Sequence, residues 1–448
     1  MNIALSDHFD YKKLLRFVMP SVGMMVFTSI YGVVDGFFVS NWTGKTPFAA
    51  INLIMPFLMI FSSIGFMVGT GGTALVSMRF GENKPRAANR IFSMLVYFII
   101  IMGLILTVIG EIWLRDVALL LGATEEMLPY CVDYGRIIMM ALVPFMLQNL
   151  FQSFLVAAER PQLGLYLTIA AGVANMVGDA VLVGMLRLGV TGAAWATAIS
   201  QMVGGIIPLV YFALPNRSRL RLGSARLDLS ALWKTCSNGA SEFMTNISLS
   251  VVNMLFNFQL MRLAGEAGVA AFGVIMYVNF IFISVYIGYS MGTAPIVSFN
   301  HGAQNRRELQ NIFAKSLRLI GLAAIVMTAI AIGLSRPLAL LYVSYDAELL
   351  AMTEHAFRLY SLAFLLCGFN IYGSAFFTAL NNGAVSAGIS FLRTLLFQAG
   401  MVLLLPLLWQ LDGVWLSVFF SELLSLAVTV YFWVRLRDKY GYIAPPKV

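Results

Sequence analysis

Charged residues are scarce in this chain. They make up 11% of its 448 residues, whereas soluble domains carry about 25%. Apolar runs longer than about 18 residues, long enough for a helix to cross a bilayer, recur along the whole chain. The short alternating segments of a membrane β-barrel are missing. The sequence therefore predicts an all-α polytopic membrane protein and excludes a soluble globular fold.

Cysteine and histidine are also rare. The three cysteines, Cys131, Cys236 and Cys367, are scattered through apolar segments, so we expect neither a disulfide framework nor a metal site of thiolates. The three histidines lie near span ends or in tails, and no clustered acidic motif of a membrane transferase occurs. The loops lack a phosphate-binding pattern. We therefore expect no enzyme, no direct use of ATP and no cofactor.

The apolar runs predict twelve transmembrane helices. They cover about 14–40, 48–78, 90–112, 126–157, 163–184, 190–214, 233–261, 268–299, 310–334, 348–380, 384–405 and 413–434.

Basic residues are unevenly divided between the two sides of the predicted bundle. If the N-terminus is inside, the inner loops hold 21 of the 29 Lys and Arg residues, including Lys447, and the outer loops hold 5, including Lys45. The positive-inside rule then predicts a multi-pass protein of the cell (inner or plasma) membrane, with both termini cytoplasmic. The net charge of +8 belongs to these loops, so no nucleic-acid partner is expected.

The chain divides into two similar halves. A polar, arginine-rich linker, residues 216–232, separates an N-lobe (1–215, spans 1–6) from a C-lobe (233–448, spans 7–12). Residues 49–81 align without gaps on 270–302, with eleven identities at a constant offset of 221. An even number of spans per half preserves orientation, which predicts two six-helix bundles related by a pseudo-two-fold axis along the membrane normal. We expect such a protein to be a monomer surrounded by membrane lipids.

Two acids lie at matching depths inside spans 1 and 5 of the first half, where a carboxylate is costly without a partner or a water-filled cavity. Asp35 and Asp179 are each five residues from the predicted outer end of their spans, and Asn175 precedes Asp179 by one turn. Thr197 lies at a similar depth in span 6. The four residues can form one polar cluster that takes a proton or binds Na+. Alternatively, the two acids merely hydrate an outer aqueous vestibule.

The internal repeat provides a comparison for this cluster. The equivalent positions in the second half are all apolar: Phe256, Phe397, Met401 and Val418. A purely structural polar cluster would more plausibly recur in both halves, so the difference favours a function for the first-half cluster.

Several segments together resemble the MATE (multidrug and toxic compound extrusion) transporters, and most of all their DNA-damage-inducible protein F-like branch. They are SIYGVVDGFFVS, MRFGENKPRAAN, NMVGD and VTGAAWATAISQ, and the resemblance covers essentially the whole chain. It implies a cation-coupling site at the same four residues, with H+ or Na+ as the coupling ion. It also matches Pro20 to a proline at which the first helix bends. The residues alone leave open whether Pro20 kinks the helix or starts it.

Other polar residues in the spans are candidates for substrate binding or gating. Glu242 is expected to be an interfacial or gate residue, and Glu422 either attracts a cationic substrate or pairs with a neighbouring helix. Arg393 has no evident partner in the sequence. Three further residues line a polar path or act as interhelical contacts, namely Gln148, Asn149 and Asn253.

The resemblance implies a cation-coupled antiporter that exports lipophilic, often cationic, drugs and toxic compounds by alternating access. The alternative is a flippase for a lipid-linked or amphiphilic substrate. A flippase would favour a cationic groove for pyrophosphate, whereas this sequence offers a carboxylate pair.

Overall fold

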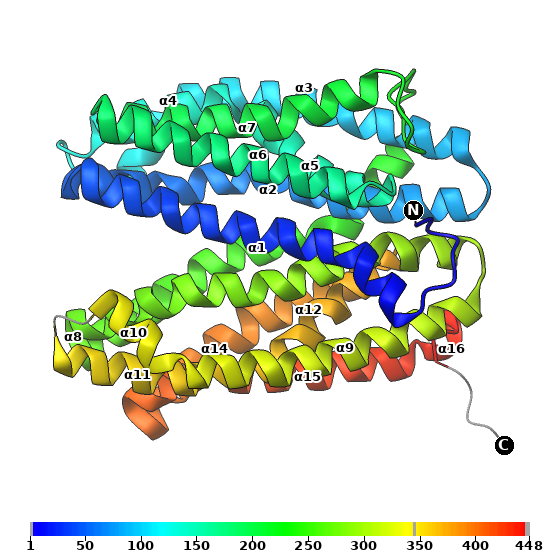
Figure 1. The fold of residues 1–448 in the computed structure, drawn as a ribbon. Coiled ribbons are helices and arrows are strands. Elements are labelled where there is room, and N and C mark those ends of the chain that lie inside the picture. Colours follow the sequence, from blue (N-terminus) through cyan, green and yellow to red (C-terminus); the bar gives the residue numbers. More distant parts are fainter. Residues whose placement is uncertain (1–2, 344–345, 444–448) are drawn as a thin grey trace.

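The structure, a computed structural model, describes residues 3–343 and 346–443. Lys447 lies outside the described residues, as does the side chain of Lys45. Two helical bundles lie one above the other, and the described chain begins and ends on the same side of the molecule (Figure 1). We call this the terminus side.

The first bundle contains the chain up to residue 213. Its elements are α1 (Tyr11–Trp42), α2 (Lys45–Gly81), α3 (Pro85–Leu120), α4 (Leu128–Met140), α5 (Leu142–Ala157), α6 (Pro161–Gly178), the π-helix η1 (Asp179–Met185) and α7 (Gly189–Ala213).

The second bundle follows an extended segment. Its elements are α8 (Leu229–Gly302), α9 (Arg306–Gly333), α10 (Ser335–Val343), α11 (Ala347–Ser361), α12 (Phe364–Ala379), α13 (Gly383–Phe391), the π-helix η2 (Leu392–Phe397), α14 (Gln398–Leu404), α15 (Pro406–Arg435) and α16 (Arg437–Tyr440).

These elements make twelve membrane spans, as predicted. Within the described residues, nine helices are long and apolar enough to cross a bilayer, and two bent pairs, α4 with α5 (57°) and α11 with α12 (46°), bring the number to eleven. The 74-residue α8 supplies the twelfth, because Gly265 breaks it with φ 62° into two helices of spanning length. Glycine accepts this left-handed conformation without the steric cost of a Cβ atom.

Some predicted boundaries were wrong. α3 continues to Leu120, eight residues beyond the predicted end at 112, because the charged residues that end the apolar run still form helix readily. The predicted loop 262–267 is a break at Gly265 alone. The last span begins close to its predicted start at 413, because non-helical dihedrals at Trp409 and Gln410 separate it from the short helical stretch that begins α15 at Pro406.

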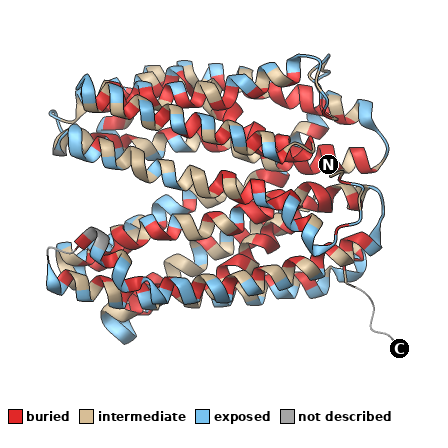
Figure 2. Ribbon diagram, viewed as in Figure 1, coloured by how far each residue is buried: buried red, intermediate tan, exposed pale blue. Residues whose placement is uncertain are grey.

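The apolar side chains form two buried clusters, one in each bundle (Figure 2). The first half of α1, from Leu14 to Met25, belongs to the cluster of the second bundle, whereas Val39 near its end belongs to that of the first. α1 therefore links the two bundles.

Contacts between the bundles follow the internal repeat. A Cβ atom on Gly71 would lie 2.1 Å from the Thr235 carbonyl oxygen of α8, and one on Gly292, its repeat partner, would lie 2.8 Å from Val18 of α1. Nearer the terminus side, a Cβ on Gly81 would lie 2.0 Å from the Phe299 carbonyl oxygen. Small residues of this kind let membrane helices approach closely.

The N-terminal segment closes the terminus side by bonding to both bundles. The Leu5 N–H donates to Glu159 Oε1 at 2.8 Å in the first bundle. The Phe9 N–H donates to Glu308 Oε1 at 3.0 Å in the second bundle, and His8 Nδ1 lies 2.7 Å from Glu308 Oε2. Leu5 and Phe9 are both fully buried.

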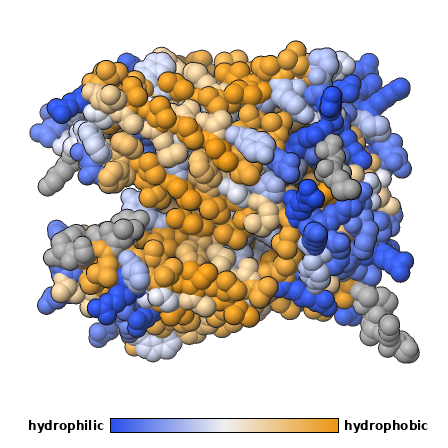
Figure 3. All heavy atoms as spheres, in the orientation of Figure 1, coloured by the Kyte–Doolittle hydropathy of each residue, from blue (hydrophilic) through white to orange (hydrophobic). Residues whose placement is uncertain are grey.

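The opposite side is open. The surface shows an apolar belt with hydrophilic ends, and a notch separates the two bundles on the side away from the termini (Figure 3). The structure therefore has its bundles joined on the terminus side and apart on the other.

Candidate functional site

Three elements of the first bundle carry the predicted polar cluster. Asp35 lies seven residues before the end of α1, Asn175 lies on α6, and Asp179 is the first residue of η1. Asp179 is fully buried and Asn175 is 2% exposed. Thr197 projects from the neighbouring α7.

The two carboxyl groups lie within interaction distance of one another, and Asn175 lies beside Asp35. Five buried oxygens nevertheless have no hydrogen-bond donor among the described residues: Asp35 Oδ1, both Asp179 carboxyl oxygens, Asn175 Oδ1 and Thr197 Oγ1. Two ionised carboxylates can only accept hydrogen bonds, so contact between them satisfies neither. A shared proton or a bound cation would supply what is missing, because buried charges need a partner.

Helix packing brings these residues together. A Cβ atom on Gly178 would lie 3.0 Å from Cα of Ala196, so α6 and α7 touch directly beside Asp179. A Cβ on Gly172 would meet the Phe27 and Tyr31 rings of α1 at 2.4 and 2.8 Å. The change from α-helix to π-helix at Asp179 widens the turn there, and π-bulges of this kind are frequent at functional sites.

Two tyrosines that the sequence did not single out, Tyr31 and Tyr134, adjoin the polar cluster. Tyr31 lies close enough to Asp35 to feel its charge and interacts with Gln148. Tyr134 feels both carboxyls and interacts with Thr197. Tyr31 precedes Asp35 by four residues and so shares its helix face, a signal that was available in the sequence. Tyr134 comes from α4, and only the fold places it here.

Pro20 does not start the first helix. α1 begins at Tyr11, with Asp10 capping the N–H of Lys13, so Pro20 is a buried residue in the helix interior. The interior position fits the interpretation in which this proline weakens the helix, since it cannot donate the usual backbone hydrogen bond.

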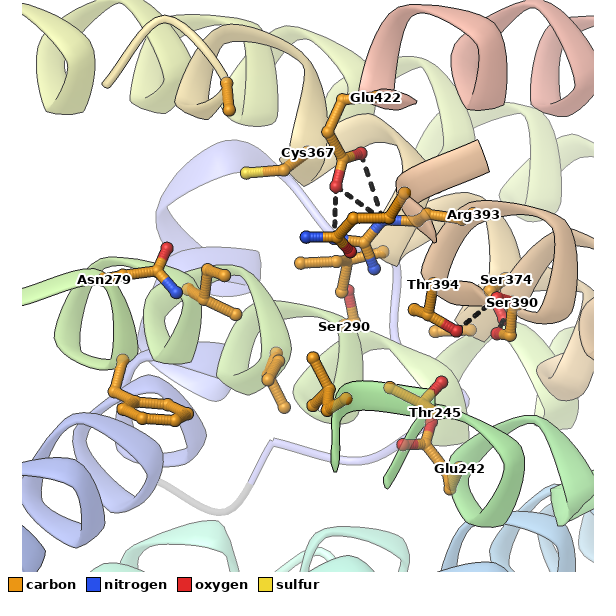
Figure 4. Close-up of a pocket in the computed structure, with 18 of the residues that line it drawn as sticks. Glu242, Thr245, Asn279, Ser290, Cys367, Ser374, Ser390, Arg393, Thr394 and Glu422 are labelled. Atoms are coloured by element: carbon orange, nitrogen blue, oxygen red, sulfur yellow. Dashed lines mark hydrogen bonds and ion pairs between the residues drawn. The ribbon is translucent and has the colours of Figure 1, made fainter. Parts of the chain in front are cut away.

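A second candidate region is a cavity of about 230 Å³ lined mostly by the second bundle and on one side by α2 and α5 of the first (Figure 4). Most of its wall is aromatic or aliphatic, including Phe256, Met276 and Phe364. Glu242 and Asn253 of α8 line it, and Arg393 and Glu422 line it as well; a role in substrate binding or gating stays a prediction. Met and aromatic walls adapt to ligands of different shape.

Glu422 is paired within the protein. Its carboxylate accepts from Arg393 Nε at 2.8 and 3.0 Å and from Asn370 Nδ2 at 2.7 Å, and Thr429 Oγ1 donates to Asn370 Oδ1 at 3.0 Å. The partner of Arg393 that the sequence did not reveal is therefore Glu422, 29 positions along the chain. This geometry favours the pairing alternative for Glu422 over a free acid that attracts substrate.

The other predicted polar residues lie elsewhere. Asn149 Nδ2 donates to the Ser62 carbonyl oxygen of α2 at 3.1 Å, which is an interhelical contact. Gln148 is buried against Gly204 of α7 and interacts with Tyr31. Neither is among the residues that line the cavity.

Comparisons with known proteins agree on one family. The MatE family profile matches residues 20–181 and 243–403, one segment in each bundle. The multidrug export protein MepA of Staphylococcus haemolyticus is 22% identical over 324 residues, 72% of each chain.

Solved structures share the whole fold. A crystal structure of a MATE protein in complex with MaL6 superposes with a TM-score of 0.91 at 20% identity, covering 96% of this chain and 97% of the other. An outward-facing multidrug resistance MATE transporter superposes with a TM-score of 0.90 at the same identity and coverage. The narrower assignment to the DNA-damage-inducible protein F-like branch stays a prediction. The two matched segments cover most of both bundles, and the chain belongs to the MatE family of membrane transporters.

Proposed function

We propose that this protein is an antiporter that exports lipophilic, often cationic, compounds and is driven by H+ or Na+. The observation that carries the proposal is the group of five unpartnered oxygens on Asp35, Asn175, Asp179 and Thr197, buried in the first bundle. None of these four residues lines the apolar cavity, whose wall comes mostly from the second bundle and partly from α2 and α5. One region is suited to a small cation and the other to an apolar molecule.

α1 is the element that would couple the two. Its first half packs with the second bundle, and its last turns carry Asp35 toward α6 and η1. A proton or Na+ between Asp35 and Asp179 removes the repulsion of two carboxylates and draws α1 toward α6. Pro20 lies within the part of α1 that packs with the second bundle, before the turns that carry Asp35, and its missing N–H removes one backbone hydrogen bond there.

The direction of transport follows from the orientation predicted by the basic loops. With the terminus side in the cytoplasm, the notch between the bundles opens outward and the N-terminal segment closes the inner side (Figure 3). Cation binding from outside would then accompany release of substrate to the outside. The related MepA proteins are named as multidrug exporters, which supports small drug-like substrates for this chain.

The cavity wall supports the same substrate class. Its lining is largely apolar, and Glu242 supplies a carboxylate that suits a lipophilic cation. A flippase for a pyrophosphate-linked lipid would need an unneutralised cationic groove. Arg393, the arginine of the cavity, is instead ion-paired with Glu422 at 2.8 Å.

The proposal is tested by dye efflux from proteoliposomes under separately imposed proton and sodium gradients. Wild type is compared with Asp35→Asn and Asp179→Asn, and with Asp133→Asn, an exposed acid of the same bundle, as the matched control. We expect both cluster variants to fall to the level of empty vesicles and the control to retain efflux. The effective gradient identifies the ion. Unchanged efflux in Asp35→Asn would refute the coupling role.

A further inference from the structure

A basic pocket on the terminus side shares no lining residue with either region described above. It has a volume of about 720 Å³ between the end of α2, the start of α3 and the segment before α8. Its charged lining residues are Arg79, Lys84, Arg86, Arg90, Arg226 and Asp228.

The segment that joins the two bundles is fixed along one face of α3. The Arg221 N–H donates to Asn89 Oδ1 at 2.7 Å, and the Gly223 N–H donates to Ser93 Oγ at 3.0 Å. Tyr97 OH donates to the Gly223 carbonyl oxygen at 3.1 Å. The three α3 residues are spaced by four, so they form a single row on the helix. This row holds the segment that carries Arg226 against the start of α3.

Part of the positive charge is already neutralised. Glu82 Oε2 lies 2.7 Å from Arg79 and 3.0 Å from Lys84. Burial would raise the pKa of the Glu82 carboxyl, but its contacts with Lys84 and Arg79 hold that pKa below its usual value. Glu82 therefore stays ionised at neutral pH.

The pocket keeps a net positive charge, because three of its arginines have no carboxylate within ion-pair distance in the part of the chain that the structure describes. Within residues 3–343 and 346–443, Arg86, Arg90 and Arg226 make no ion pair. Asp228 also lines the pocket, but its carboxylate accepts from the Ala231 N–H and caps α8. The pocket also includes the first residues of α3, whose N-terminal end favours an anion. Fork-shaped guanidinium groups converging on one space are suited to phosphate oxygens.

Apolar side chains next to Arg226 indicate where that phosphate would come from. Leu227, Leu229 and Trp233 follow it in sequence and are 75%, 67% and 75% exposed. Large apolar residues at this exposure, next to basic ones and at the end of a membrane helix, fit the boundary between headgroups and acyl chains. A free phosphate would use the arginines and leave these three side chains in water.

We propose that this pocket binds the headgroup of an anionic phospholipid of the leaflet on the terminus side, with its acyl chains against Leu227, Leu229 and Trp233. Basic pockets at the ends of membrane helices bind such headgroups. Because Arg226 lies on the segment that connects the two bundles, the bound lipid holds this connection to the membrane surface.

The test measures lipid retention by native mass spectrometry after reconstitution in phosphatidylcholine with or without phosphatidylglycerol. The pocket variant carries Arg86→Gln, Arg90→Gln and Arg226→Gln. The control variant carries Arg217→Gln, Arg307→Gln and Arg437→Gln, three exposed arginines of the same side that do not line the pocket. Each arginine near a membrane surface contributes severalfold to binding, so we expect about a hundredfold weaker retention of phosphatidylglycerol in the pocket variant. The control should retain it like wild type.

Two results would overturn the assignment. Equal loss of phosphatidylglycerol in both variants would mean that diffuse positive charge, not this pocket, attracts the lipid. Displacement of retained phosphatidylglycerol by millimolar inorganic phosphate would make a free phosphate the ligand. Far-ultraviolet circular dichroism and elution volume of the pocket variant confirm its fold, and the measurement does not depend on transport activity.

Discussion

The buried ion pair of the second bundle permits a quantitative prediction. Arg393 and Glu422 make three N–O contacts of 2.8 to 3.0 Å, and their side chains are 15% and 6% exposed. Glu242 lines the same cavity from another helix (Figure 4), and the charge of Arg393 acts on it through space. The guanidinium therefore pairs directly with Glu422 and also lies within electrostatic range of Glu242. Removing it should cost more than removing either acid.

The magnitude follows from what each substitution leaves behind. Arg393→Met leaves Glu422 with Asn370 alone and leaves Glu242 without a nearby cation, so we expect the free energy of unfolding to fall by about 3–5 kcal/mol. Glu422→Gln keeps a side-chain oxygen that can accept from Arg393, and the Glu242 carboxylate remains within electrostatic range of the guanidinium. That variant should lose about 1–3 kcal/mol.

Equilibrium unfolding in mixed SDS micelles measures both variants and the double variant Arg393→Met/Glu422→Gln. We expect the double variant to lose less stability than the sum of the two single losses. It removes both charges of the pair, so neither is left buried without its partner. Strict additivity would show that the two side chains do not interact in the membrane. A loss below about 1 kcal/mol for Arg393→Met would refute the assigned role of the pair.

Two further predictions concern the terminus side. A Cβ on Gly81 would lie 2.0 Å from the backbone oxygen of Phe299, so Gly81→Val should force the bundles apart and lower the thermal unfolding midpoint by several degrees. The control Gly388→Val has open space at its Cβ and should leave the midpoint unchanged. Equal midpoints for the two variants would contradict the contact. Glu308→Ala removes the acceptor of the Phe9 N–H, so hydrogen exchange at residues 3–10 should become at least about tenfold faster, while Glu348→Ala, on the opposite side, should leave it unchanged.

The membrane fold was readable from the sequence because hydrocarbon imposes a simple requirement. Every span needs about 20 apolar residues with internally bonded backbone, and the lengths of these runs predicted twelve spans. The constant offset between residues 49–81 and 270–302 predicted the two bundles. The helix ends were less predictable: α3 runs on to Leu120, since helical hydrogen bonds continue after hydrophobicity ends.

Pairings across the bundles required the tertiary structure. Asp35 and Asp179 were predicted to share a depth, and rise per residue is enough for that inference. The Arg393–Glu422 pair and the approach of Tyr134 to the acids depend on how helices rotate and cross, which no local pattern encodes. The same is true of the basic pocket. Arg226 stands far along the chain from the arginines of α2 and α3, and the row Asn89, Ser93 and Tyr97 holds its segment beside them. Hydrophobicity thus determined which segments enter the membrane, whereas side-chain packing between segments decided which polar groups meet.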